Sequence, residues 1–376
     1  MKVLITGGAG FIGSWLIEAL AASGHQMIIV DNLSPQIHGA IPQTEMPWLR
    51  NEAVEFIRAD IRDYEVMDGA LAKVDAVVHL AAETGTGQSM YQIGHYYDVN
   101  QQATAYLFEA IGTKHRHIKR VILASSRSIY GEGAYKLNGD LYVPQPRSSE
   151  HMNRGEFEPV GPHGESLGLI PTPEHVQPKP ASIYAATKLA NETLGQIFSD
   201  AYRVPVIALR FQNVYGERQS LQNPYTGILS IFSNRMRQNL PINIFEDGNE
   251  SRDFVHVHDV VRALDLALNL PLNDFHAINV GSGINISVME VAILLRKLLK
   301  SSSKLSVTGD FRTGDIRHCF ADLKKAKQLL HFEPKLNIEE GMQKFCLWVE
   351  QQPILIDRSE SAMSNLANLG LGRSHV

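Results

Sequence analysis

Short runs of apolar, often β-branched residues alternate with helix-period segments through the first half of the chain. A parallel strand that is buried on both faces appears as a near-continuous apolar run, whereas a covering helix places apolar residues every three to four positions. The pattern therefore predicts an α/β fold with a doubly wound, parallel, Rossmann-type sheet. The predicted strands are 2–6, 26–31, 54–59, 75–81, 120–125 and 205–210, and the predicted helices include "FIGSWLIEALAAS", "QQATAYLFEAIG" and "YAATKLANETLGQIFSDAY".

Two segments depart from this alternation. Residues 131–181 are rich in Pro, Gly, His and Ser and far exceed the length of an ordinary connection, which predicts an insertion with a function or a mobile lid. Beyond Gly216 the elements become shorter and mixed, which predicts a smaller α/β domain interleaved with the first. We therefore expect a Rossmann domain at 1–215, a substrate-binding domain at 216–350 and a polar, loosely held tail at 351–376.

Composition narrows the choice of partners and compartment. The 376 residues carry a formal net charge of -5 and no long basic run, which argues against nucleic acid or an anionic membrane surface as partner. No run approaches the roughly 18 apolar residues of a membrane span, and the N-terminus reaches glycines too soon for a signal sequence. Cys319 and Cys346 form no Cys-x-x-Cys pair, so we expect neither disulfides nor a thiolate zinc site, and a cytoplasmic location.

The segment "TGGAGFIG" follows the first predicted strand and opens the first predicted helix. Gly7, Gly10 and Gly13 fit the motif G-x-x-G-x-x-G, and Gly8, Gly10 and Gly13 fit G-x-G-x-x-G. Such glycines permit a tight turn and close approach of a pyrophosphate to the helix N-terminus. Asp31 ends the next strand, where a carboxylate binds a ribose diol and repels a 2′-phosphate. The motif predicts NAD rather than NADP as the cofactor.

A second group of residues predicts proton and hydride chemistry. Tyr184 and Lys188 are four residues apart on a predicted helix and share one face. A free tyrosine titrates near pH ~10, but a nearby ammonium and the positive nicotinamide ring favour the phenolate. Ser126 follows a predicted strand at the sheet edge where ligands bind, and its hydroxyl can hydrogen-bond a substrate hydroxyl. Each signal is weak alone, and together they predict a catalytic site.

These motifs, with "RADI" (58–61), "HLAA" (79–82) and Asn100, resemble the extended short-chain dehydrogenase/reductase family, specifically its nucleotide-sugar epimerases and dehydratases. The similarity runs from Met1 to about Pro334. It implies an adenine pocket lined by Asp60 and Ile61, a bridge from Lys188 to the nicotinamide ribose, and a homodimer formed by two helices. The cofactor-binding residues that it implies are Gly7, Gly10, Phe11, Ile12, Gly13, Asp31, Asn32, Asp60, Ile61, Leu80, Ala81, Ala82, Asn100, Tyr184 and Lys188.

The resemblance also implies a nucleotide-sugar site in the second half of the chain. Asn213, in "LRFQNVYGERQ", is similar to the asparagine that binds the sugar diphosphate in this family. Guanidinium forks suit two adjacent phosphates. The residues expected to hold the diphosphate beside Asn213 are Arg252, Arg312 and Asp315, and those expected to face the sugar are Thr84, Gln88, Ser89, Ser126 and Arg127.

The residues after Ser126 favour one reaction of the family. Its 4,6-dehydratases carry an Asp-Glu pair directly after the catalytic Ser or Thr, but this chain has Arg127 and Ser128, which cannot supply that acid and base. Epimerisation at C4 remains, by transient oxidation to a 4-keto sugar. Tyr184 would take the proton of the 4-hydroxyl as NAD accepts the hydride, which NADH then returns to the other face.

Four further stretches, 81–93, 125–135, 223–235 and 314–335, resemble the dTDP-L-rhamnose 4-epimerases, which interconvert dTDP-L-rhamnose and dTDP-6-deoxy-L-talose. The alternatives are a UDP-hexose or UDP-uronate 4-epimerase, an NAD-dependent nucleotide-sugar dehydrogenase or 4-ketoreductase, and a non-catalytic NAD-binding scaffold. A scaffold would be expected to have lost catalytic residues, but this chain keeps Ser126, Tyr184 and Lys188. Gly161 and Gly164 stand where some relatives have cysteines, so we expect no metal.

Overall fold

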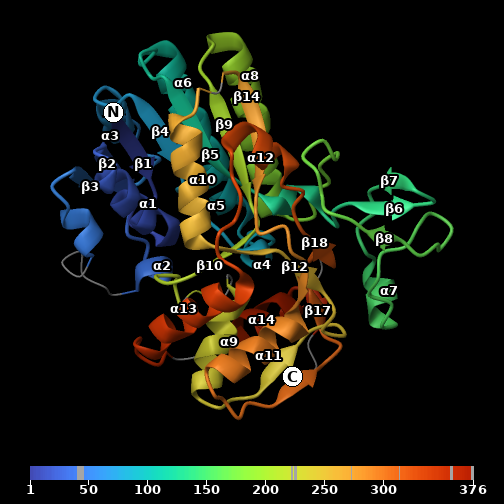
Figure 1. Cartoon of the computed structure of the whole chain (residues 1–376). Coiled ribbons are helices and arrows are strands. Elements are labelled where there is room, and N and C mark those ends of the chain that lie inside the picture. Colours follow the sequence, from blue (N-terminus) through green and yellow to red (C-terminus); the bar gives the residue numbers. More distant parts are fainter. Residues whose placement is uncertain are drawn as a thin grey trace.

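The central sheet of the computed structural model has seven strands, all parallel, in the order β14-β9-β5-β4-β1-β2-β3. The structure describes residues 1–39, 46–221, 223, 227–271, 273–312, 314–355 and 359–373. Strand β1 lies between β2 and β4 (Figure 1), so the winding reverses there. In open parallel sheets such a reversal opens a crevice at the carboxyl ends of the strands. The bounds are β1 Lys2–Thr6, β2 Gln26–Asp31, β3 Val54–Arg58, β4 Ala76–His79, β5 Arg120–Ser126, β9 Val206–Phe211 and β14 Phe275–Val280.

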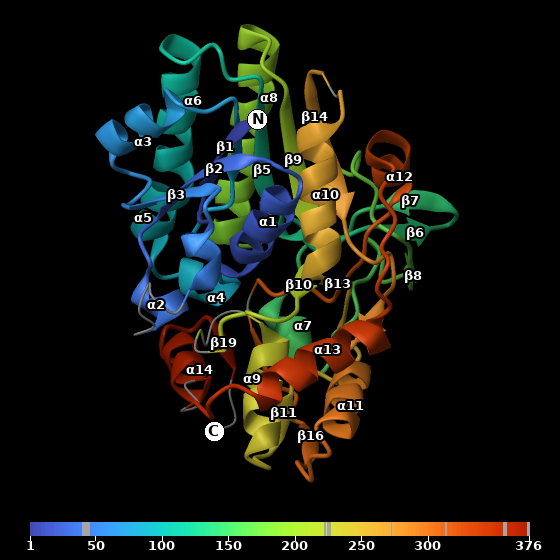
Figure 2. The same cartoon turned by 60° about the vertical axis from the view of Figure 1, so that its left-hand side comes forward.

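Two apolar layers hold helices against the two faces of this sheet (Figure 2). The buried faces of the strands are almost wholly apolar, which explains why helices cover both sides. No helix in the described part of the chain has the length and apolar character that crossing a membrane requires. One face is covered by α1 Phe11–Ala22, α10 Val257–Asn269 and α12 Lys324–Leu330, and the other by α3 Tyr64–Leu71, α6 Ala103–Thr113 and α8 Ile183–Tyr202.

The predicted doubly wound sheet is confirmed, and one strand was missed. All six predicted strands are present, with bounds that differ by at most two residues. The seventh, β14, comes from the range 216–350 that we assigned to the second domain, as do α10 and α12. Strand β14 pairs with β9 along its whole length, and this pairing places it in the first domain's sheet. The range 216–350 thus supplies both parts of the molecule.

A smaller α/β lobe faces the carboxyl edge of the sheet, below it in Figure 1. Its own apolar core joins three helices to short strands. The helices are α9 Ile228–Arg237, α11 Val288–Leu298 and α13 Ile338–Glu350. The strands are β10 Asn213–Tyr215, β11 Ile242–Ile244, β12 Ser251–Arg252, β13 Phe254–His256, β15 Ile286–Ser287, β16 Leu305–Val307, β17 Phe311–Arg312 and β18 His318–Cys319.

The insertion 131–181 is tied to the small lobe by buried ion pairs. Arg147 contacts Glu132 and Glu246 at 2.9 and 2.8 Å, and Arg317 also contacts Glu246, at 2.9 Å. Arg317 reaches Glu158 of the insertion at 2.6 Å. These contacts give the insertion a fixed base, although its outer strands stand away from the rest of the molecule at the right of Figure 1. Its elements are β6 Tyr135–Leu137, β7 Asp140–Tyr142, α7 Ser149–Asn153 and β8 Gly168–Leu169.

The tail is more ordered than its polar composition predicts. It contains helix α14 (Ser359–Asn368) and strand β19 (Gly372–Arg373), which pairs antiparallel with β17. Leu366 is only 4% exposed and packs close to Gly87. The described part of the tail therefore contacts the folded chain through the apolar side chain of Leu366 and the pairing of β19 with β17.

Candidate active site

A cavity of about 480 Å³ opens at the carboxyl edge of the central sheet. The segments that follow β1, β2, β4, β5 and β9 line it on one side, and Gln219, Ser220 and Gly227 line it from the start of the small lobe. Most of the site residues predicted from the sequence meet here. They are Gly7, Gly10, Phe11, Ile12, Gly13, Asp31, Asn32, Asp60, Ile61, Leu80, Ala81, Ala82, Thr84, Ser126, Arg127, Tyr184, Lys188 and Asn213.

The glycine loop leaves the N-terminus of α1 open to a ligand. Gly7 has φ +70°, and a Cβ on it would lie 2.7 Å from the backbone nitrogen of Ala81. A Cβ on Gly13 would lie 2.5 Å from Cα of Gly8, so helix and loop pack at backbone contact. No side chain caps α1 at Gly10, and its first turn has no acidic residue. The first N–H groups and the positive end of the helix dipole therefore suit the pyrophosphate of NAD.

Asp31 lies at the far end of the same cavity and is itself held in place. Its Oδ2 accepts a hydrogen bond from the backbone N–H of Ala9 (3.1 Å), and Oδ1 accepts one from that of Leu33 (2.8 Å). Burial raises the pKa of Asp31, although the N–H of Leu33 and nearby His38 oppose the rise. Asn32 donates to Asp60, which joins the two segments. A fixed carboxylate at this edge fits the ribose of NAD.

Ser126, Tyr184 and Lys188 converge where β5 meets α8. Burial raises the pKa of Tyr184, and the nearby hydroxyl of Ser126 and the charge of Arg127 oppose this rise. Lys188 lies with its ammonium 5.8 Å from the Tyr184 ring centre and donates to the carbonyl of Ala124 at 2.9 Å. Burial lowers the pKa of Lys188 to about 8. The arrangement can move a proton between Tyr184 and a bound hydroxyl.

Arg127 is a second cation near Tyr184, and its charge lowers the pKa of the Tyr184 hydroxyl against the effect of burial. Its Nε donates to Oδ1 of Asn213 at 2.6 Å, while Nη1 is buried without a hydrogen-bond partner. Burial and neighbouring Arg252 lower the pKa of Arg127 to about 10. A buried guanidinium with a free nitrogen is suited to an anionic or oxygen-rich ligand.

Arg252, Arg312 and Asp315 do not line the cavity but lie next to Arg127, behind its wall. Arg252 pairs with Asp315 at 3.0 Å. Burial opposes ionisation of Asp315, yet the charges of Arg252, Arg312, Arg127 and Arg147 together lower its pKa. Guanidinium groups beside the cavity wall suit the oxygens of a diphosphate.

Three predicted residues support the wall of the cavity without lining it. Asn100 is fully buried in a π-helical turn (η3, Tyr97–Gln102) and bonds both backbone groups of Glu83, which lines the cavity. Ser89, at the end of α4 (Thr86–Ser89), accepts from the backbone N–H of Tyr184 at 3.1 Å. Gln88 pairs with Gln36 through two amide hydrogen bonds. Ser89 therefore fixes the start of α8, and Gln88 does not face the cavity.

Several cavity residues were missed from the sequence. Phe211 and Gln212 belong to the same motif as Asn213, so their place directly before it was an available signal that went unused. His38 belongs to α2 (Pro35–His38), and its Nε2 lies 3.8 Å from Oδ1 of Asp31. No sequence pattern indicated this contact, because it depends on how the chain turns back after β2.

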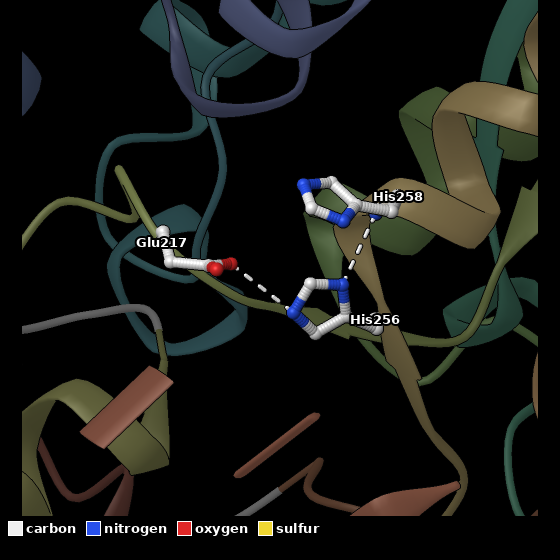
Figure 3. Close-up of side chains that lie close together, drawn as sticks. All are labelled: Glu217, His256 and His258. Carbon is white, nitrogen blue, oxygen red and sulfur yellow. Dashed lines mark hydrogen bonds and ion pairs between the residues drawn. The ribbon is translucent and has the colours of Figure 1, made fainter. Parts of the chain in front are cut away.

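One group among the described residues has the chemistry of metal ligands: Glu217, His256 and His258, whose candidate ligand atoms lie within 4.8 Å of one another (Figure 3). Glu217 Oε2 lies 3.1 Å from Nε2 of His256, and Nδ1 of His256 accepts the N–H of His258 (3.3 Å) at the start of α10. A neutral imidazole has one proton, which must then sit on Nε2, although neither Nε2 nor the facing Oε2 of Glu217 makes a hydrogen bond. A histidine bound to a metal would donate from its other nitrogen instead. The contact at Nδ1 of His256 therefore fits a helix cap.

Comparison with known proteins agrees with this geometry. The chain is 36% identical over 355 residues to a dTDP-L-rhamnose 4-epimerase of Burkholderia thailandensis, which covers 93% of this chain and 95% of that protein. It resembles the crystal structure of Thermotoga maritima UDP-glucose 4-epimerase with UDP-glucose (TM-score 0.75, 28% identity, 93% of this chain and 99% of that one). It also resembles Bacillus cereus UDP-glucuronic acid 4-epimerase in complex with UDP-glucuronic acid and NAD (TM-score 0.74, 26% identity, 93% and 99%).

Residues 3–281 match the NAD dependent epimerase/dehydratase family, and this range spans the whole central sheet and most of the cavity wall. The family resemblance and the NAD cofactor predicted from the sequence are thereby confirmed. Because one match covers the glycine loop, Asp31 and the Ser126–Tyr184–Lys188 group together, the chain belongs to the NAD dependent epimerase/dehydratase family.

Proposed function

We propose that this enzyme is a nucleotide-sugar 4-epimerase that interconverts dTDP-L-rhamnose and dTDP-6-deoxy-L-talose. The observation that carries the proposal is that Ser126, Tyr184 and Lys188 meet in one cavity wall, and that Arg127 and Ser128, not an acid, follow Ser126. Such a site can oxidise and reduce one carbon but offers no acid for dehydration there. The 36% identity to a dTDP-L-rhamnose 4-epimerase supports this substrate.

The reaction follows from the chemistry of these side chains. The glycine loop and Asp31 would hold NAD, which would supply reversible hydride transfer at C4. Tyr184 removes the proton of the 4-hydroxyl and gives it back after the 4-keto sugar has turned. Ser126 holds the oxygen at C4 through its hydroxyl. Arg127 and Lys188 surround this pair with positive charge, which favours the phenolate form of Tyr184.

One alternative substrate is supported by a specific observation. The buried Nη1 of Arg127 has no partner and lies in the cavity wall, so it could bind the carboxylate of a UDP-uronate. The similar Bacillus cereus protein was crystallised with UDP-glucuronic acid. We favour the 6-deoxysugar because identity to the curated UDP-glucuronate 4-epimerase of Thermodesulfobacterium geofontis is lower, at 29%. A UDP-hexose, or a dehydrogenase or ketoreductase reaction, remains the further alternative.

Proton NMR of the purified enzyme with dTDP-L-rhamnose and no added NAD tests the function. We expect the C4 epimer to appear without net formation of NADH, because the cofactor is regenerated in each turnover. Parallel samples contain UDP-glucose and UDP-glucuronate. Conversion of either one without conversion of dTDP-L-rhamnose would refute the substrate assignment, and stoichiometric NADH would indicate a dehydrogenase.

We further infer that the enzyme acts as a homodimer in the cytoplasm, with the adjacent helical segments η3–α6 and α8 at the interface. Exposed apolar side chains gather on these segments: Tyr97 (41%), Tyr106 (40%) and Ile197 (62%). Large apolar side chains left exposed on neighbouring helices favour a partner surface. Light scattering should give twice the mass of the chain, and Ile197→Glu should shift the protein toward the monomer. A wild-type monomer at micromolar concentration would contradict this inference.

A further inference from the structure

Part of the cavity wall beside Ser126 carries polar atoms that have no hydrogen-bond partner among the residues that the structure describes. Gln212 is only 4% exposed, and both its Oε1 and its Nε2 are buried without a hydrogen bond. Its backbone N–H is satisfied, because it donates to the carbonyl of Val280 at 2.9 Å. The fold therefore accounts for the backbone at this position but not for the amide.

The position of Gln212 relates it to the catalytic group. In the pairing of β5 with β9, Ser126 stands opposite Phe211, so Gln212 follows directly beyond the partner of Ser126. The next residue, Asn213, accepts the hydrogen bond of Arg127. Two more unpartnered atoms lie in the same wall, Nη1 of Arg127 and Oγ of Ser128. Unsatisfied polar atoms thus gather around the end of the cavity where Ser126 and Tyr184 act.

A buried amide without a partner is unfavourable, and an apolar side chain of the same shape would avoid that cost. Such a group is explained when the partner arrives with a ligand. An amide offers one acceptor and two donor hydrogens, which matches a hydroxyl, since a hydroxyl both donates and accepts. A phosphate could use only the donor hydrogens of the amide, and the neighbouring arginines are already available to bind negatively charged groups.

We propose that Gln212 is a specificity residue that hydrogen-bonds a ring hydroxyl of the sugar, next to the carbon on which Ser126 and Tyr184 act. This inference rests on the proposed function, because it assumes that a sugar occupies this end of the cavity. Gln212 then selects for a sugar with a hydroxyl at the contacted ring position, and its amide makes no contact with the diphosphate or the cofactor.

The test uses Gln212→Met, which keeps the shape of the side chain and removes its hydrogen bonds. Binding of dTDP-L-rhamnose and of dTDP is measured by calorimetry in the Tyr184→Phe background, so that no sugar is converted. We expect Gln212→Met to bind dTDP-L-rhamnose about 10- to 100-fold more weakly than the parent protein does. Its affinity for dTDP and its NAD content should equal those of the parent protein. Equal affinity for dTDP-L-rhamnose would overturn the proposal, as would an equal loss for dTDP or a fall in NAD content.

A second measurement does not depend on how the variant folds. The parent protein is titrated with analogues of the nucleotide sugar that each lack one ring hydroxyl, and one analogue should bind about 10-fold more weakly or worse. If Gln212 hydrogen-bonds that hydroxyl, Gln212→Met should bind this analogue and the unmodified nucleotide sugar with equal affinity. Uniform binding of all analogues to the parent protein would refute the proposal.

The control is Gln101→Met, because Gln101 also has a buried Oε1 without a partner but does not line the cavity. It should bind dTDP-L-rhamnose as the parent does. If the parent binds only UDP-glucose, the proposed 6-deoxysugar function fails, and the same comparison is made between UDP-glucose and UDP. A selective loss of UDP-glucose in Gln212→Met would then still support the role of Gln212, and no loss would overturn it.

Discussion

Tyr184→Phe should lower kcat about 10³-fold, because it removes the group that we propose takes the proton of the substrate hydroxyl. Phenylalanine fills the same space, and the backbone N–H at position 184 can still donate to Ser89. The NAD content and the thermal midpoint should therefore match the wild type. Single-turnover formation of the epimer and acid release of bound NAD provide the two measurements.

The matched control for this change is Tyr135→Phe. Tyr135 is 2% exposed, its hydroxyl has no hydrogen-bond partner, and it does not line the cavity. Loss of that hydroxyl should leave kcat within about twofold of the wild type. If Tyr184→Phe also kept most of its activity, Tyr184 could not be the proton acceptor, and the catalytic assignment would have to be abandoned.

Arg127→Met should lower kcat/KM about 10²-fold and move the rising limb of its pH profile to higher pH. The guanidinium makes a 2.6 Å hydrogen bond to Asn213, and its charge lowers the pKa of Tyr184 against the effect of burial. A lost hydrogen bond to a charged group costs about 1.5–3 kcal/mol. Without the charge the Tyr184 pKa rises, so the phenolate forms only at higher pH. Initial rates of epimerisation between pH 6 and 10 would test both effects.

Two variants separate charge from geometry at this position. Arg127→Lys keeps a positive charge but cannot reproduce the fork to Asn213, so it should restore the pH profile while kcat/KM stays below the wild type. Arg154→Met removes an exposed arginine that pairs with Glu150 and Glu156, and both quantities should stay unchanged. An unshifted pH profile in Arg127→Met would show that the charge of Arg127 does not act on Tyr184.

The positions nearest the cofactor could be predicted because they depend on local rules. Gly7 and Gly13 are required because a Cβ at either position would clash with a neighbouring backbone segment. Asp31 ends β2, the strand that follows α1. Tyr184 and Lys188 share a helical face by their spacing alone. Each of these residues lies in the cavity, as the sequence indicated.

The positions that were misjudged depend on contacts between distant segments. Ser89 was expected to face the sugar, but its hydroxyl holds the N–H of Tyr184, 95 residues away in the chain. Asn100 was expected to contact the cofactor and instead supports Glu83 from a π-helical turn. Motif similarity gives the identity of such residues and their approximate region, but not the direction in which the side chain points.

The sequence by itself determined the parallel sheet, the glycine loop, the choice of NAD and the catalytic spacing, because strand periodicity, helical spacing and backbone sterics act over a few residues. Only the tertiary structure decided that β14 completes the first sheet, that Leu366 of the tail is buried, and that the charge of Arg127 acts on the Tyr184 hydroxyl. Each of these depends on burial and electrostatic fields created by segments far apart in the chain, and such terms have no signature in the local order of residues.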